Sequence, residues 1–197
     1  MNQTQSRSLA TLKKLLPGEI KLAPATLKQY AGDKWFASHL PDAVALPRST
    51  KSVAAILRFA NKHGIPVTAR GAGHGYVGGC VPLRGGIVIS LERMDRIKEI
   101  NAGDFVVVTQ PGVITATLQA EVEKQNRYYP PDPASRGESS IGGNIITNAG
   151  GPRCLKYGVT RDYVLGLEVV LADGTIVRLG SRTHKNKTGF DLHRLFV

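Results

Sequence analysis

Two glycine-rich segments carry the residue types best suited to chemistry in this 197-residue chain. Residues 70–79 read Arg-Gly-Ala-Gly-His-Gly-Tyr-Val-Gly-Gly and place five glycines around His74. Because glycine lacks a Cβ and accepts positive φ angles, backbone N–H groups in such a segment can converge on an anion. Residues 139–151, Ser-Ser-Ile-Gly-Gly-Asn-Ile-Ile-Thr-Asn-Ala-Gly-Gly, form a second segment of this kind. Together they predict a large phosphate-bearing cofactor bound from two sides, and a structural bend is the alternative for the first segment.

Neither of the common phosphate-binding motifs is present. The Rossmann fingerprint needs Gly-x-Gly-x-x-Gly at the start of a helix. Here the first segment contains Gly-x-Gly-x-Gly, and the following Cys80-Val-Pro-Leu-Arg-Gly-Gly86 cannot open a helix. No Gly-Lys-Ser/Thr occurs, which excludes the P-loop.

The periodicity around these segments predicts a mixture of helices and strands. Ser49 and Thr50 cap a helix that ends at His63-Gly64, and the strand at 66–69 then leads into the first glycine segment, as in a β-α-β unit. Asp173-Gly174 is expected to turn a hairpin over 165–179. The other expected elements are helices at 9–16, 24–30 and 114–126, and strands at 43–46, 86–90 and 105–109. The predicted class is α+β in two lobes, with the seam near 126–133.

Composition restricts the partners. The formal charge of +11 favours anionic ligands, but the basic residues are scattered and no nucleic-acid-binding module is recognisable, so no nucleic acid is expected. No run approaches the roughly 20 apolar residues of a membrane span, and no secretory signal is visible. Cys80 and Cys154 are expected as small buried thiols, and no metal site is expected. A cytoplasmic setting follows, with peripheral membrane attachment as a further expectation.

Six short motifs occur in an order that closely resembles the FAD domain of the vanillyl-alcohol oxidase/PCMH flavoprotein superfamily. The nearest branch is the group of glycolate oxidase FAD subunits and D-lactate dehydrogenases, and the resemblance runs from about Ala43 to Val197. The motifs are Arg70-Gly-Ala-Gly-x-Gly, Tyr129-Pro-Pro-Asp-Pro-Ala-Ser135, Ile141-Gly-Gly-Asn144, Asn148-Ala-Gly-Gly151, Leu155-Lys-Tyr-Gly158 and Lys187-Thr-Gly-Phe-Asp-Leu192.

The resemblance implies a domain division. Residues 1–42 would be an N-terminal helical lead-in, and residues 43–197 an FAD-binding PCMH-type domain. Lobe one would span about 43–126 and lobe two about 127–197, the latter incomplete. The chain stops at Leu195-Phe-Val197 in mid-pattern, which we interpret as truncation before a cap domain that lies over the flavin ring in this family.

The resemblance also implies which residues bind FAD. The first glycine segment would lie against the pyrophosphate, and residues from the second half would lie by the flavin, the ribityl chain and the adenine. The implied pyrophosphate residues are Gly71, Ala72, Gly73, His74 and Gly75, with Gly78 and Gly79 close by. Those for the flavin and ribityl region are Asp132, Pro133 and Ser135, those for the second wall are Ser139, Ser140, Gly142, Gly143 and Asn148, and Val169 would face the adenine. A glycine-rich turn between helices is the alternative for the second wall, and a core valine is the alternative for Val169.

His74 departs from the nearest relatives, which commonly carry threonine there. Covalent branches of the superfamily place at this position the histidine that bonds the flavin 8-methyl carbon. A neutral imidazole nitrogen is a competent nucleophile, so we hypothesise a histidyl-FAD bond through His74. The alternative is a histidine that only forms hydrogen bonds beside a phosphate.

The function implied is oxidation of a small D-2-hydroxy acid, such as glycolate or D-lactate, by hydride transfer to flavin N5. Electrons would leave to a separate acceptor, and a partner subunit or cap domain would complete the substrate site. The chemistry belongs to the flavin, and no catalytic base can be assigned. The alternatives are a covalent-flavin sugar or alcohol oxidase and an FAD-binding module without turnover.

Overall fold

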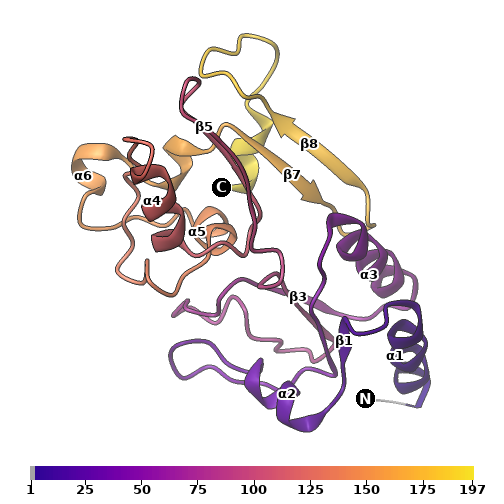
Figure 1. Ribbon diagram of the computed structural model, residues 1–197. Helices are drawn as coiled ribbons and strands as arrows, with labels where there is room; N and C mark the ends of the chain where they lie inside the picture. Colours follow the sequence, from indigo (N-terminus) through magenta and orange to yellow (C-terminus); the bar gives the residue numbers. More distant parts are fainter. Residues whose placement is uncertain (1–2) are drawn as a thin grey trace. The chain divides into compact units, whose positions relative to one another are not determined.

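The computed structural model describes residues 3–197 (Figure 1), which divide into two compact units. Unit 1 contains the chain up to Met94 together with Val170–Ile176, and unit 2 contains Asp95–Val169 and Val177–Val197. Both units combine helices with strands, so the α+β class is confirmed. Residues 1 and 2 of the predicted lead-in lie outside the described residues.

Unit 1 is built on a four-stranded sheet in the order β1-β2-β4-β3. The strands are β1 (Ile20–Lys21), β2 (Ala43–Ala45), β3 (Val67–Arg70) and β4 (Ile87–Ser90). Both β2 and β3 run parallel to β4, whereas β1 is antiparallel to β2. The predicted β-α-β unit is therefore present as β2-α3-β3, but its two strands are not neighbours because β4 lies between them.

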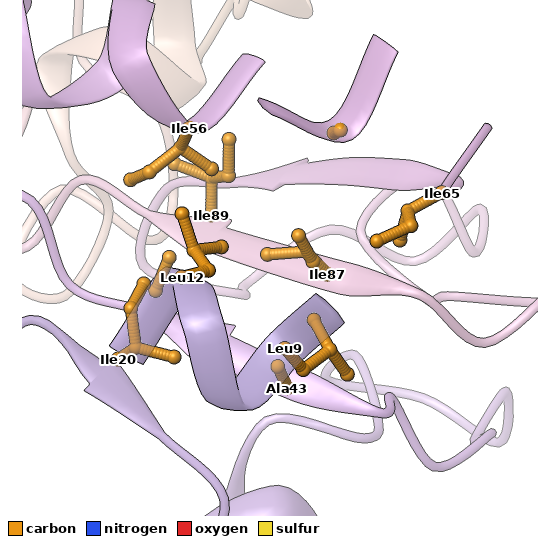
Figure 2. Packing of buried hydrophobic residues seen from close by; sticks show 10 residues of the cluster. Leu9, Leu12, Ile20, Ala43, Ile56, Ile65, Ile87 and Ile89 are labelled. Carbon is orange, nitrogen blue, oxygen red and sulfur yellow. The ribbon is translucent and has the colours of Figure 1, made fainter. Parts of the chain in front are cut away.

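One face of this sheet is covered by two long helices, α1 (Gln3–Leu15) and α3 (Thr50–Lys62). Their apolar stripes and the odd-numbered residues of β2 and β4 form one buried cluster, as Figure 2 shows. Its members from these elements are Leu9, Leu12, Ala43, Ala45, Ile56, Ala60, Ile87 and Ile89. The Ser49 hydroxyl accepts the N–H of Ser52 at 3.1 Å and so starts α3 where the sequence predicts it.

The opposite face packs against α2 (Pro24–Gln29) and the residue that follows it. Val44 and Val88 point to this side, because successive side chains of a strand alternate between faces. They pack with Tyr30 and Leu46, all of them almost completely buried. Strand β4 is therefore apolar on both faces, which is typical of a strand in a sheet covered on both sides.

Unit 2 has its own core. The hairpin of β5 (Ile97–Asn101) and β6 (Val106–Thr109) packs with α4 (Thr115–Glu123) and α5 (Ile141–Ile146). The buried members of this core are Val113, Leu118, Val122 and Ile141. Strand β5 was not predicted, because adjacent charged residues and a bulge between Ile97 and Glu99 break the apolar alternation.

The predicted hairpin near residue 174 is confirmed as β7 (Gly166–Val170) and β8 (Ile176–Gly180). Its tip belongs to unit 1, where the Arg58 guanidinium donates to the carbonyl of Gly174 at 3.0 Å. The remaining helices of unit 2 are short: α6 (Cys154–Tyr157), η1 (Thr160–Tyr163) and η2 (Leu192–Phe196).

The unit boundary lies at Met94/Asp95, whereas the seam was expected near 126–133. The difference has a physical cause: the β5–β6 hairpin contributes Ile97, Ile100 and Val107 to the core around α4 and α5. The division into a lead-in and two lobes of the family domain stays a prediction.

The second glycine segment contains helix α5, so the alternative of a turn between helices is wrong. The Ser140 hydroxyl caps the helix by accepting the N–H of Gly143 at 3.3 Å. Gly142 lets the helix approach Pro111 closely. A Cβ at Gly142 would lie 2.6 Å from the Pro111 Cβ, whereas a Cβ at Gly143 would meet only the Ser140 hydroxyl at 3.3 Å.

These two neighbouring glycines give a matched pair of variants. Gly142→Ala should lower the free energy of unfolding by about 1–3 kcal/mol, because Pro111 belongs to a backbone turn that leaves no room for a methyl group. Gly143→Ala should stay within about 1 kcal/mol of the wild type, since alanine favours a helix and the serine hydroxyl can rotate. Urea unfolding followed by circular dichroism measures both, and equal losses would contradict the close-approach role of Gly142.

Candidate functional site

The first glycine segment forms an open loop directly after β3. Residues 71–86 contain no helix, as their sequence predicts. Gly73 and Gly78 adopt φ angles of +79° and +74°, a region that residues with a Cβ rarely enter. Within residues 3–197, no protein acceptor takes the backbone N–H of Gly71, Gly73 or Gly75. The loop therefore offers unused N–H donors, which is what an anion requires.

A neighbouring segment braces the far side of this loop. The Asp33 carboxylate accepts the N–H of Gly78 at 2.9 Å, and the carbonyl of Gly75 accepts the N–H of Lys34 at 3.2 Å. His74 is half-buried, whereas Tyr76 is 61% exposed and packs edge-on against Trp35, with 5.8 Å between the ring centroids. These contacts hold the second half of the loop, from Gly75 to Gly78.

In unit 2, Asp132 and Pro133 lie against Gly151, and a turn follows in which the carbonyl of Pro133 accepts the N–H of Arg136 at 2.8 Å. A Cβ at Gly151 would lie 1.9 Å from the carbonyl oxygen of Asp132, so only glycine permits this approach. The Asp132 side chain is 11% exposed and forms ion pairs with Arg136 at 3.2 Å and with Arg153 at 3.3 Å. Its charge is therefore neutralised by two guanidinium groups.

The residues from Ser135 to Asn144 form a hydrogen-bonded unit around Thr115. The carbonyl of Ser135 accepts the N–H of Ser139 at 2.7 Å, and the Ser139 carbonyl accepts from both the N–H and the hydroxyl of Thr115. The Asn144 amide donates to the Thr115 hydroxyl at 2.5 Å. Thr115, Ser139, Ser140 and Asn144 are all buried. Their side chains thus stabilise the second wall itself, and direct contact of Ser139 or Ser140 with a cofactor stays a prediction.

Asn148 lies at the C-terminal end of α5, where its N–H donates to the carbonyl of Ile145 at 3.0 Å, and Val169 lies on β7. Asn148 adopts φ +46°, which asparagine tolerates, and its side-chain carbonyl accepts the N–H of Arg161 at 2.9 Å. Val169 is half-buried. Both assignments to the cofactor stay predictions.

The residues predicted to bind FAD thus form two groups, one in each unit. Those predicted for the pyrophosphate share one loop of unit 1, and those predicted for the flavin, ribityl and adenine regions belong to unit 2. Sequence reasoning missed three residues that hold these sites: Arg70, Thr115 and Asn144. Arg70 and Asn144 stand within the glycine motifs, so their position was the available signal, whereas nothing in the sequence marks Thr115.

Other residues considered from the sequence have simpler roles. Tyr129 packs on the core of unit 2, and burial, followed by the nearby Tyr163, raises its pKa to about 12, so it stays a neutral phenol. Cys80 is half-buried and Cys154 is exposed, so the expectation of a buried thiol is wrong for Cys154, which lies on the exposed helix α6. Within residues 3–197, no cluster of metal-ligating side chains occurs, and no helix has the length and apolar character needed to span a membrane.

Curated relatives resemble this chain closely. It is 49% identical over 158 residues to the glycolate oxidase subunit GlcD of Bacillus subtilis, a match that covers 80% of this chain and 34% of that protein. It is 37% identical over 198 residues to a D-lactate dehydrogenase of Anaerostipes hadrus, covering 100% of this chain and 42% of the relative. The chain thus spans between a third and half of the length of these proteins.

Solved structures share its fold. A 4-ethylphenol oxidase from Gulosibacter chungangensis superposes with a TM-score of 0.85 at 28% identity, covering 100% of this chain and 40% of that structure. A glucooligosaccharide oxidase from Acremonium strictum, whose FAD is described as 6-S-cysteinyl and 8α-N1-histidyl, superposes with a TM-score of 0.72 at 24% identity. That match covers 88% of this chain and 36% of the oxidase.

A family described as an FAD binding domain matches residues 41–180, a range that includes both glycine segments. The unused N–H donors of the first segment and the close-packed glycines of the second suit such a domain. The chain belongs to this FAD binding domain family, of the PCMH type, and its cofactor is FAD.

Proposed function

We propose that this chain is the FAD-binding part of an oxidoreductase that oxidises a small D-2-hydroxy acid, such as glycolate or D-lactate. The observation that carries the proposal is the 49% identity with a glycolate oxidase subunit. A D-2-hydroxyglutarate dehydrogenase of Stutzerimonas stutzeri, 42% identical over 183 residues, adds a third relative named for a hydroxy acid. These three relatives are named for different acids that share an oxidisable 2-hydroxyl group.

The loop after β3 fits the pyrophosphate of FAD. Gly71, Gly73 and Gly75 have N–H groups that no protein acceptor takes within residues 3–197, and the Gly73 backbone requires a residue without a Cβ. Two phosphates need several such donors at close range. We assign the pyrophosphate to this loop, with His74, Gly78 and Gly79 beside it.

The turn at Asp132 and the second wall would hold the flavin and ribityl part. When bound, FAD supplies the two-electron acceptor for oxidation of the hydroxy acid. The residues of this chain would bind and orient FAD. The ion pairs of Asp132 with Arg136 and Arg153 stabilise the turn that follows Asp132. Gly142 allows α5 to pack closely against Pro111. The substrate base is proposed to lie outside this chain.

The partners and the location follow from the same proposal. Electrons pass to a separate acceptor, and a partner subunit or a further segment completes the substrate site. The word subunit in the name of the glycolate oxidase relative supports such an assembly. The cytoplasmic setting and the peripheral membrane attachment expected from the sequence stay predictions.

The reaction is tested by anaerobic reduction of the FAD-loaded chain together with the partner subunit or further segment that completes its substrate site. D-lactate or glycolate should bleach the visible absorption of the flavin, because hydride transfer reduces its ring system. L-lactate is the matched control. It has the opposite configuration at C2, so its hydrogen would not be directed at the flavin and the spectrum should stay unchanged.

The remaining outcomes separate the alternatives. A yellow chain that no hydroxy acid bleaches would contradict enzymatic activity of this chain and favour a binding module. A chain bleached by sugars or alcohols alone would favour the covalent-type oxidase.

We propose further that His74 bonds the flavin covalently. An imidazole nitrogen would bond the 8α-carbon as each partner loses a proton, while two electrons pass into the flavin and are removed by dioxygen. The position of His74 in the middle of the pyrophosphate loop and its half-buried side chain support the proposal.

Acid precipitation of the FAD-loaded chain tests this bond. The wild-type pellet should stay yellow, whereas His74→Asn should release its flavin into the supernatant, because asparagine cannot form the bond. His63→Asn is the matched control, since His63 ends α3 and stacks on Phe59. Complete release of colour from the wild type would show that His74 only forms hydrogen bonds.

A further inference from the structure

Arg70 is the last residue of β3, and its side chain folds back beneath the loop that it introduces. The guanidinium Nη1 donates to the carbonyl of Gly32 at 2.5 Å and to the Cys80 sulfur at 3.4 Å. A Cβ placed on Gly73 would lie 2.1 Å from its Nη2. One side chain thus touches the turn of the loop, its far end and the neighbouring segment.

This guanidinium packs against the buried side chain of Tyr30. It lies over the ring of Tyr30, 5.6 Å from the centroid, within cation–π distance. The Tyr30 hydroxyl donates to Glu92 at 2.7 Å, and the Ser90 hydroxyl donates to the other oxygen of the same carboxylate at 2.9 Å. Burial, followed by the Glu92 hydrogen bond, raises the pKa of Tyr30 to about 12, so the ring stays a neutral donor.

The positive charge of Arg70 has no direct counter-ion. Within the part of the chain that the structure describes, no carboxylate forms an ion pair with it, although Glu92 binds the adjacent tyrosine and Asp33 binds Gly78. A half-buried arginine usually pairs with a carboxylate, because an unpaired charge away from water is costly. Here the charge lies directly behind the loop whose N–H groups are unused.

We propose that Arg70 is the positioning residue for the FAD pyrophosphate. Its guanidinium supports the loop at Gly73 and keeps the N–H groups directed at the phosphates, and its charge attracts them through the thin glycine backbone. The inference rests on the proposed pyrophosphate site and adds to it a positively charged side chain behind the loop.

The test measures, by quenching of flavin fluorescence, the dissociation constant for FAD of the 197-residue chain, prepared without flavin and in a His74→Asn background that excludes a covalent bond. Arg70→Gln should raise this constant about 10- to 100-fold, as expected for loss of a charged group at a phosphate site. Arg70→Lys should recover part of the loss because it keeps the charge. Arg84→Gln removes an equal charge from an exposed position in the same unit and should stay within about twofold.

The salt dependence of FAD binding distinguishes a role of the Arg70 charge from a purely structural role of its side chain. The dissociation constant of the wild type should rise with ionic strength more steeply than that of Arg70→Gln, because only the wild type retains the charge. Equal salt slopes, or an Arg70→Gln constant within about twofold of the wild type, would overturn the inference.

A second variant tests the contact with Gly73. Gly73→Ala has two effects. It strains the backbone in every variant because of the positive φ angle. Where residue 70 is arginine, the alanine methyl group also displaces the guanidinium. Gly73→Ala should therefore weaken FAD binding more in the wild type than in Arg70→Gln, and additive effects would overturn the contact. A wild-type chain that ignores FAD would overturn the proposed function as well, whereas wild-type binding with an unaffected Arg70 variant overturns this inference alone.

Discussion

The burial of β4 on both faces is the constraint on which unit 1 depends. Ile87 and Ile89 pack under α1 and α3, and Val88 packs on the α2 side. A strand without access to water must satisfy its backbone on both edges, so β2 and β3 both pair with it. Gly86 lets the chain enter β4 beneath Pro66, because a Cβ there would lie 2.1 Å from the Pro66 carbonyl oxygen. The end of β3, and with it Arg70, is thereby fixed in space.

A fixed end of β3 is what makes a glycine loop useful as a binding site. Glycine costs conformational entropy when it is ordered, so a loop of five glycines needs supports outside itself. Arg70 supports it from beneath, and Asp33 holds it through the N–H of Gly78. The N–H groups that the protein leaves unused are the ones that we propose for the pyrophosphate.

Much of the fold could be predicted from the sequence, because local signals agreed with the final packing. The Ser49 cap, the Asp173-Gly174 hairpin and the apolar run of β4 are examples. The insertion of β4 between β2 and β3 could not be predicted, since strand order depends on long-range pairing. Helix α5 was not predicted because its glycines disfavour a helix, and the contact with Pro111 explains only Gly142.

The predicted binding residues illustrate the same limit. Glycine spacing pointed to the loop after β3, but the support from Arg70 depends on how its side chain folds back, which no spacing reveals. Thr115 joins the second wall through a hydrogen bond to a residue 29 positions away. Contacts between residues far apart in the sequence can be identified only from the packed structure.

The positions of individual charged groups matter more for this site than the net charge of the chain. The total of +11 comes from scattered surface groups, whose fields fade within about 8 Å at physiological ionic strength. Arg70 is half-buried and lies directly behind unused N–H groups, so solvent screens it less. In unit 2, two guanidinium groups on Asp132 also leave a local excess of one positive charge. If Arg70 has the role that we propose, selection of a phosphate-bearing cofactor depends on where this one guanidinium is held more than on the overall basic composition.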